Sequence, residues 1–390
     1  MTTDRFHVAD LDLAGLLGQA MVLPIYGGST ANVTTEQAAA NRSIYGAATP
    51  REVIEQLRPG GVLLLDRIPF HPHFGKLPLG NVESATQLAE YTEELQAAAT
   101  TAGLPRMMIV ADQEGGRVNR LPVLPLPPAK AIGATGDRDL ARRAGELTGS
   151  MATSFGVGVV EGPVAAVGFK NPAIGDRAFG ADPDLVTDMV AATVEGIRAA
   201  GAASVVKHWP GLGRAEGDGH TSPPALNVDL ADWHNVELRA FRAAVRAGVD
   251  AVLVTHATFP AADPTGRPAS ISAPIVERIR TDAEFGGVVI SDSLWMPDIR
   301  HSSASDAEIG MNALRAGVDL LLAPPDPRGV IELVTSSPVR DELQPMLEQA
   351  LARTLALRRR MPNVVSPLRG HDWSDDVDHM NQTIKSEAGQ

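Results

Sequence analysis

The sequence has no cysteine, few aromatic residues and little positive charge. The absence of cysteine from all 390 residues excludes disulfides, thiolate nucleophiles, cysteine zinc sites and iron–sulfur clusters. Aromatic residues make up 4 % of the chain, which argues against a long aromatic-lined platform. The formal net charge is −13, and the one basic run is Arg358-Arg359-Arg360. Because proteins that bind nucleic acid or anionic membranes do so through a basic surface, we expect neither partner.

Long apolar runs are also missing. The most apolar stretch, 13–26, contains Gln19 and Pro24 and is shorter than the roughly 20 residues that cross a bilayer. The N-terminus is acidic, whereas a secretory signal begins with a positive segment. We therefore predict no membrane span and a cytoplasmic protein. The overall composition, 44 % hydrophobic and 21 % charged, is typical of a globular protein.

Short runs rich in Val, Ile and Leu recur along the chain, and longer segments of helical period separate them. The runs are apolar on nearly every residue, as in parallel strands covered on both faces. Their positions are 20–25, 61–65, 107–111, 156–160, 204–208, 251–255, 287–291 and 319–323. The candidate helices are 35–57, 84–102, 137–154, 184–200, 232–247, 273–281, 305–316 and 327–360.

Eight alternating strand and helix segments predict an α/β fold, a single (β/α)8 TIM-type barrel over residues 1–361. Two of the helices end in the same signature, Arg-Ala-Gly-Val-Asp, at 246–250 and 315–319. A doubly wound open sheet is less favoured because no Gly-x-Gly-x-x-Gly follows the first strand. Residues 362–390 are polar and acidic and show no periodic apolar pattern, so we predict an extended or disordered C-terminal tail.

In such a barrel the chemistry lies on the loops after the strands, and those loops are rich in charge. Buried charges are costly unless paired, so stability alone hardly accounts for this many at one end. The segments are Asp112-Gln-Glu-Gly-Gly-Arg-Val-Asn-Arg120, Ile174-Gly-Asp-Arg-Ala-Phe-Gly180, Lys207-His-Trp-Pro-Gly-Leu-Gly213 with Asp218-Gly-His220, Thr255-His256, and Ser291-Asp-Ser-Leu-Trp-Met296.

Each residue taken alone allows a structural role as well. Asp112 and Asp292 fit capping or ion-pairing carboxylates, and His256 fits a buried histidine with satisfied hydrogen bonds. Asp218-x-His220 is more suggestive, because a carboxylate two residues away can fix the tautomer of an imidazole and raise its basicity for proton transfer.

The ordered set of motifs resembles the β-N-acetylhexosaminidases of glycoside hydrolase family 3, specifically the single-domain bacterial type that recycles peptidoglycan. The resemblance spans about residues 15–360. It implies a retaining enzyme that removes N-acetylglucosamine from the non-reducing end of small peptidoglycan-derived or chitin-type oligosaccharides, without a cofactor or metal. It implies nothing about protein partners.

The resemblance also assigns roles to residues. Asp292 is the nucleophile that forms a covalent glycosyl-enzyme, and His220 is the acid/base with Asp218 as its partner. The sugar is held by Asp112, Arg120, Arg177, Lys207 and His208.

Three positions depart from the family pattern. Leu212 stands where a second His is frequent, Ala166 replaces a common Asp, and Gly219 replaces the usual Ser or Thr. None has an assigned chemical step, so substrate preference stays open.

Other functions remain as alternatives. A metal-dependent barrel hydrolase could use His71, His73, His256 and Asp292 as ligands, although the His-x-His pair follows the second strand instead of the first. A β-N-acetylglucosaminide phosphorylase is an alternative closer to the favoured hydrolase, because a neutral His as the acid/base repels an incoming phosphate less than a carboxylate does. Two further alternatives are a family member that acts on another β-glycoside or a glycosylated metabolite, and a non-catalytic sugar-binding protein.

Overall fold

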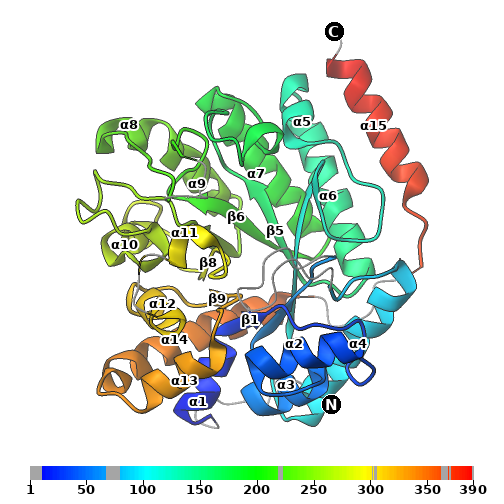
Figure 1. Ribbon diagram of the computed structural model, residues 1–390. Coiled ribbons are helices and arrows are strands. Elements are labelled where there is room, and N and C mark those ends of the chain that lie inside the picture. The colour runs from blue at the N-terminus through cyan, green and yellow to red at the C-terminus, as the bar shows by residue number, and fades with distance from the viewer. Residues whose placement is uncertain are drawn as a thin grey trace.

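The computed structural model describes residues 11–66, 80–217, 223–300, 302, 305–361, 368 and 370–388. Its main sheet consists of parallel strands that follow one another around a ring (Figure 1). The strands are β1 (Met21–Leu23), β2 (Gly61–Leu63), β3 (Met108–Gly115), β5 (Val159–Val164), β6 (Ala203–Trp209), β7 (Ala251–Val254), β8 (Val288–Ser291) and β9 (Leu321–Leu322).

The eight parallel strands form a barrel that closes on itself. Each pairs with its neighbour in the chain, and β9 pairs with β1 in the register Met21 to Leu321. A single bridge between Ile290 and Leu320 joins β8 to β9 and completes the ring. The predicted (β/α)8 barrel is confirmed. A ninth strand, β4 (Val118–Asn119), folds back antiparallel on β3.

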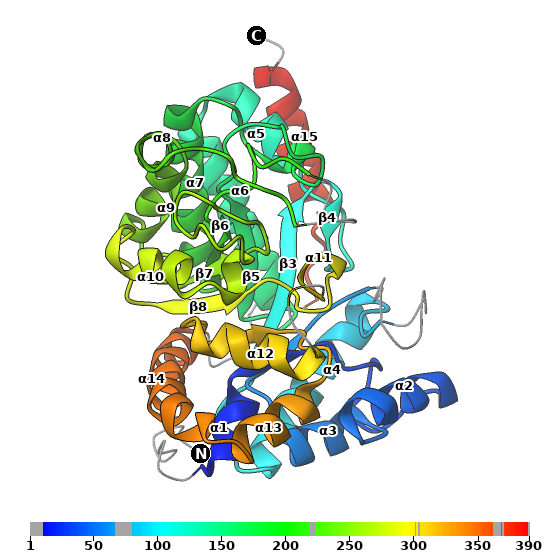
Figure 2. The ribbon, with the colours of Figure 1, turned by 60° about the vertical axis from the view of Figure 1, so that its left-hand side comes forward.

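Helices surround the barrel on its outside (Figures 1 and 2). Their apolar faces pack on the strands, whose residues are nearly all buried. The helices are α1 (Leu13–Gln19), α2 (Thr35–Tyr45), α3 (Pro50–Leu57), α4 (Ala85–Thr101), α5 (Ala129–Thr135), α6 (Arg138–Ser154), α7 (Pro183–Ala199), α8 (Leu230–Asn235), α9 (Glu237–Arg246), α10 (Ala273–Thr281), α11 (Pro297–Arg300), α12 (Asp306–Arg315), α13 (Pro327–Thr335), α14 (Val339–Arg360) and α15 (Ser374–Ala388).

Three predicted helices are each broken in two. The segment 35–57 forms α2 and α3, because Gly46 ends α2 in the left-handed conformation with φ 78° and Thr49 begins α3 with a capping box. The segment 232–247 is divided at Val236, and 327–360 at 336–338.

The repeated Arg-Ala-Gly-Val-Asp signature places two buried carboxylates at the amino ends of the strands. Asp250 accepts hydrogen bonds from the Ser204 backbone N–H and from Arg198, and it pairs with Arg360 at 2.9 Å. Asp319 accepts from the Val289 backbone N–H and pairs in the same way with two arginines, Arg280 and Arg353. This end of the barrel is therefore held by ion pairs that have no part in the chemistry at the other end.

The prediction of an extended or disordered tail from residue 362 is wrong for Ser374–Ala388, which form α15. This helix lies along α5 and α6 (Figures 1 and 2). Its apolar face is buried there, through Trp373, Val377, Met380 and Ile384. Their spacing of three and four residues is a helical period that the acidic composition obscures.

No helix in the described part of the chain is both long enough and apolar enough to span a membrane.

Candidate active site

A tight turn after β3 brings charged side chains together at the carboxyl end of the barrel. Gly115 and Gly116 have φ of 84° and 56°, in the left-handed region, and a Cβ on Gly115 would lie 2.7 Å from the Pro127 carbonyl oxygen. The chain reverses there into β4. Asp112 and Glu114 therefore lie near the carboxyl end of β3. Arg120, which follows the turn and β4, lies close to Asp112.

Lys207, near the end of β6, lies between those two carboxylates. Its Nζ is 2.5 Å from Asp112 Oδ1 and 2.6 Å from Glu114 Oε1, and its side chain is 2 % exposed. Burial alone would lower the pKa of Lys207, but the charges of Asp112 and Glu114 raise it above the ordinary value. Lys207 is therefore a fixed cation in the barrel mouth.

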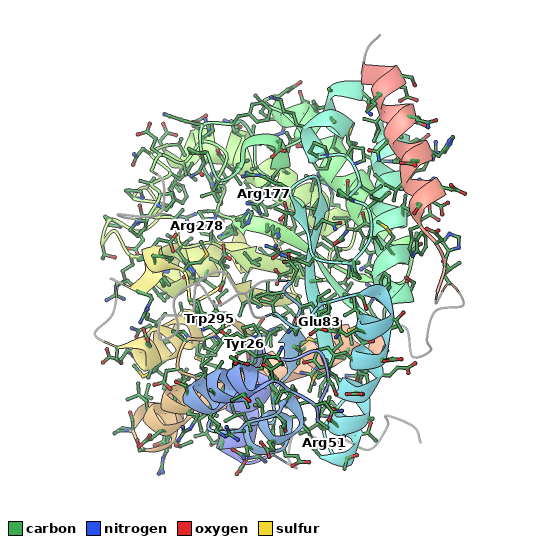
Figure 3. All side chains as sticks on the ribbon, turned by 45° about the vertical axis from the view of Figure 1, so that its right-hand side comes forward. Tyr26, Arg51, Glu83, Arg177, Arg278 and Trp295 are labelled. Atoms are coloured by element: carbon green, nitrogen blue, oxygen red, sulfur yellow. The ribbon has the colours of Figure 1, made fainter. Side chains whose placement is uncertain are left out.

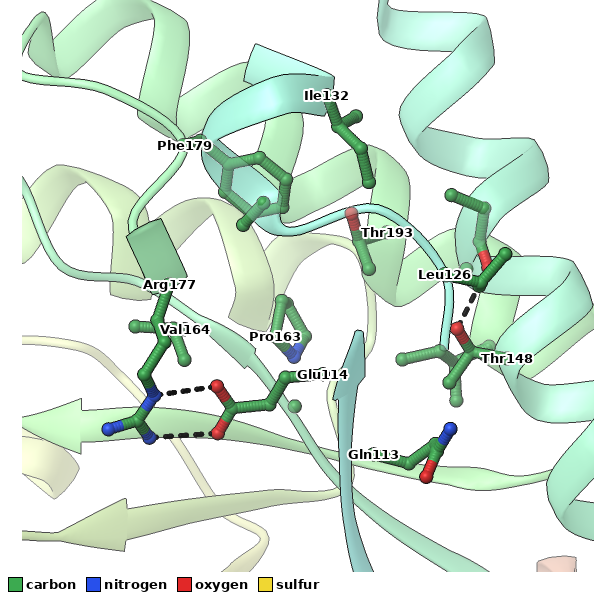
Figure 4. Close-up of a pocket in the computed structure, with 15 residues that line it drawn as sticks. Gln113, Glu114, Leu126, Ile132, Thr148, Pro163, Val164, Arg177, Phe179 and Thr193 are labelled. Carbon is green, nitrogen blue, oxygen red and sulfur yellow. Dashed lines mark hydrogen bonds and ion pairs between the residues drawn. The ribbon is translucent and has the colours of Figure 1, made fainter. Parts of the chain in front are cut away.

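Arg177, which lies in the loop after β5 (labelled in Figure 3), binds Glu114. Its Nε and Nη2 each donate to Glu114 at 2.8 Å in a bidentate pair (Figure 4), and Nη1 donates to the Ala173 carbonyl at 3.0 Å. Burial would raise the pKa of Glu114, but Lys207 and Arg177 lower it to about 2. Glu114 is thus the shared anion that orients both cations.

His208 is buried beside this cluster. Its Nε2 lies 3.3 Å from Arg177 Nη2, and because a guanidinium only donates, Nε2 must accept and the ring proton must sit on Nδ1. Burial and then the charges of Arg177 and Lys207 hold the pKa of His208 well below its usual range. The ring is therefore neutral, and its Nδ1 has no partner among the described residues.

Arg120 approaches Asp112 from the other side. Its Nη1 donates to Asp66 Oδ1 at 3.2 Å, and its Nε lies 4.0 Å from Asp112 Oδ2. The structure thus brings five predicted residues into one cluster, namely Asp112, Arg120, Arg177, Lys207 and His208.

Asp292 follows β8 and faces the same cluster. Its Oδ1 accepts a hydrogen bond from the Ser293 backbone N–H at 2.8 Å. Its charge acts on Arg177 and on Glu161 of β5, which places the carboxylate within electrostatic reach of both. The Asp292 side chain is half-buried, and its role as a nucleophile stays a prediction.

Asp218 and His220 lie outside the described residues. On either side of them, the backbones of Glu216 and Ala225 exchange two hydrogen bonds of 2.9 and 2.7 Å. Glu216 also pairs with Lys170 from the loop after β5. The roles of Asp218 and His220 stay predictions.

His256 is a buried histidine with both ring nitrogens bonded. Nδ1 lies 2.8 Å from Ser270 Oγ, and Nε2 lies 2.9 Å from the Ser293 carbonyl oxygen. The proton is on Nε2 because a carbonyl only accepts. His71 and His73 fall outside the described residues, and within the described ones no three His, Asp or Glu side chains form a metal-binding group.

Two carboxyls of the cluster were missed by the sequence reasoning. Glu114 stands inside the quoted motif but was given no role, and Glu161 directly follows the predicted strand 156–160. The position of Glu161 directly after an apolar run, at a predicted strand end, was the one signal for it. Of the departures from the family pattern, Ala166 and Leu212 are buried in the apolar core, and Gly219 is outside the described residues.

A small cavity lies behind the Glu114–Arg177 pair, between the barrel wall and α5 to α7 (Figure 4). Its volume is about 30 Å³, and Phe179, Ile132 and Ile197 are among its apolar lining residues. That space is large enough for water and far too small for a sugar.

The comparisons with known proteins agree with this geometry. Residues 43–357 match the N-terminal domain of glycosyl hydrolase family 3. A β-hexosaminidase of Nitrosomonas eutropha is 32 % identical over 284 residues, which cover 70 % of this chain and 80 % of the relative. A family 3 β-N-acetylglucosaminidase from Paenibacillus superposes with a TM-score of 0.82 at 27 % identity, over 97 % of this chain and 69 % of that one. A β-N-acetylhexosaminidase from Beutenbergia cavernae gives 0.71 at 26 %, over 90 % and 99 %. The chain therefore belongs to glycosyl hydrolase family 3 and is a glycoside hydrolase.

Proposed function

We propose that this enzyme is a retaining β-N-acetylglucosaminidase that releases N-acetylglucosamine from the non-reducing end of small peptidoglycan-derived or chitin-type oligosaccharides. The observation that carries the proposal is the fixed cluster around Lys207 that faces Asp292 across the barrel mouth. The names of the relatives, β-hexosaminidase and β-N-acetylglucosaminidase, support the sugar.

The charge balance of the cluster favours an uncharged ligand. Lys207 and Arg177 are already neutralised by Asp112 and Glu114 at 2.5 to 2.8 Å. Such a cluster offers a sugar hydroxyl both donors and acceptors in fixed positions, whereas an anion would have to compete with the carboxylates.

In the first step an oxygen of Asp292 attacks the anomeric carbon while the bond to the leaving oxygen breaks. His220, as an imidazolium, gives its proton to that oxygen, so the aglycone leaves as a neutral alcohol. Asp218 stabilises the imidazolium and fixes its orientation. The sugar is then bound to the enzyme as an ester of Asp292.

In the second step the neutral His220 takes a proton from water, and the water oxygen attacks the anomeric carbon. The bond to Asp292 breaks and the carboxylate is regenerated, which gives hydrolysis with net retention of configuration. Asp112, Arg120, Arg177, Lys207 and His208 hold the sugar during both steps.

The test is turnover of a panel of aryl β-glycosides and anhydro-muropeptides, with identification of the released sugar. Release of N-acetylglucosamine is expected, Asp292→Ala should abolish it, and His220→Ala should slow it by about 10²- to 10⁴-fold. Asp282→Asn, at the opposite end of the barrel beside Arg278, is the matched control and should leave kcat unchanged.

Three outcomes would contradict the proposal. Turnover that survives in Asp292→Ala would show that Asp292 is not the nucleophile. A sugar 1-phosphate as the main product in phosphate buffer would make the enzyme a phosphorylase, and sugar binding without any turnover would indicate a binding protein. The cytoplasmic location and the lack of a nucleic-acid or membrane partner stay predictions from composition and charge.

A further inference from the structure

Glu161 is a buried carboxyl to which the proposed mechanism gives no role. It lies on β5, is 1 % exposed, and is paired in strand register with Asp112 on β3. A β-bulge at Glu161 and Gly162, both opposite Val205, locally turns the strand at this point. The Asp112 side chain lies within hydrogen-bonding reach of Glu161, so two carboxyl groups share one position of the barrel wall.

Two carboxyl groups in direct contact in a buried site do not both ionise, and the cations decide which one keeps the proton. Asp112 has Lys207 Nζ at 2.5 Å and Arg120 at 4.0 Å. Among the described residues no cation lies within ion-pair distance of Glu161, and its Oε1 has no hydrogen-bond partner there. Asp112 is therefore the carboxylate and Glu161 the carboxylic acid.

We propose that Glu161 is a positioning residue of the sugar site: as a carboxylic acid it donates a hydrogen bond to Asp112 and fixes that carboxylate for the sugar. Lys207 and Glu161 hold Asp112 from two neighbouring strands, β6 and β5, which limits its rotation. The inference rests on the proposed function, because it takes Asp112 as a sugar-binding residue.

Ionisation of Glu161 would convert the hydrogen bond into repulsion. The charged groups that act directly on Glu161 are Asp112 from β3, Lys207 from β6 and Asp292 from the loop after β8. Three more groups of the cluster are connected to Lys207 in turn: Glu114 pairs with Lys207, Arg177 pairs with Glu114, and His208 contacts Arg177. Burial and Asp112 raise the pKa of Glu161 well above its ordinary value, so the proton is lost, and KM rises, on the alkaline side.

Two variants separate positioning from packing. Glu161→Gln keeps a hydrogen-bond donor toward Asp112 and has no proton to lose, so KM should match the wild type at neutral pH and stay flat where the wild-type KM rises. Glu161→Leu keeps the volume without the donor, so KM should increase about tenfold with a smaller change in kcat. Val160→Ile, on the opposite face of β5, controls for disturbance of the strand.

Infrared difference spectroscopy tests the proton without substrate. The wild type minus Glu161→Gln should show the carbonyl band of a protonated carboxyl at neutral pH, and its absence would overturn the inference whatever the substrate is. A Glu161→Gln variant as impaired as Glu161→Leu, or a folded Glu161→Leu with unchanged KM, would also overturn it. If instead the wild type hydrolyses no N-acetylglucosaminide, the proposed function fails, while the infrared result still decides the shared proton.

Discussion

Glu114 connects the buried Lys207 to the half-buried Arg177, so its charge should contribute measurably to stability. In Glu114→Gln one amide oxygen can still accept from Lys207 and Arg177 Nη2, but the amide NH₂ then faces the Arg177 Nε–H, and two donors meet. The pKa of Glu114 falls from 4.5 to about 2 on folding, which corresponds to about 3 kcal/mol. We expect the free energy of unfolding at pH 7 to fall by about that amount in Glu114→Gln.

The sign of the pH dependence follows from the lowered pKa. The contribution of Glu114 to the free energy of unfolding is complete above the ordinary pKa of 4.5 and is lost as the pH falls toward 2. The difference in unfolding free energy between wild type and variant should therefore shrink to about 1 kcal/mol near pH 3. Urea unfolding followed by circular dichroism at both pH values measures it. Glu146→Gln, which removes an exposed pair with Arg142, is the matched control and should cost less than about 0.5 kcal/mol. A Glu114→Gln variant as stable as that control, or a gap independent of pH, would refute the reasoning.

Three further outcomes can be checked. Asp319→Asn should lower the free energy of unfolding by about 3–5 kcal/mol in the same urea assay, because it leaves Arg280 and Arg353 without their shared anion. The value of kcat should stay unchanged, because this ion pair lies far from the mouth, and a lowered kcat would contradict the separation of the two ends of the barrel. Gly115→Ala should cost about 1–3 kcal/mol and raise KM, because φ of 84° is strained with a side chain; a neutral result would mean that the turn relaxes. Trp373→Ala should speed hydrogen exchange across Ser374–Ala388 with no loss of turnover, and unchanged exchange would show that α15 is held by its other contacts.

The barrel was predictable because each strand carries its own signal. Continuous apolar runs mark all eight parallel strands, and the predicted helix 273–281 coincides residue for residue with α10. The breaks at Gly46 and Val236 were missed because a helical period continues across a short turn. The C-terminal helix was missed for a different reason: its few apolar residues find partners on α5 and α6, which lie far away in the sequence.

The site was predictable in its residues but not in its connections. Strand ends and motif order pointed to Lys207 and Arg177, yet which carboxylate each cation meets depends on how neighbouring strands are staggered. That stagger puts Glu161 level with Asp112, and no local pattern in the sequence indicates it. The protonation state of Glu161 is even harder to predict from the sequence, because it depends on burial and on cations contributed by other strands.

The closing of the barrel between its first and last strands has a consequence for synthesis. β1 finds its second neighbour only in β9, and Arg358 of α14 donates to Gln19 across 339 positions of the chain. Until residue 322 has left the ribosome, β1 and β8 are therefore open edges of an apolar sheet, the kind of surface on which chains aggregate. A chain truncated before β9 keeps both edges exposed, so the last βα unit, which carries none of the proposed chemistry, decides whether the rest can exist as a closed barrel.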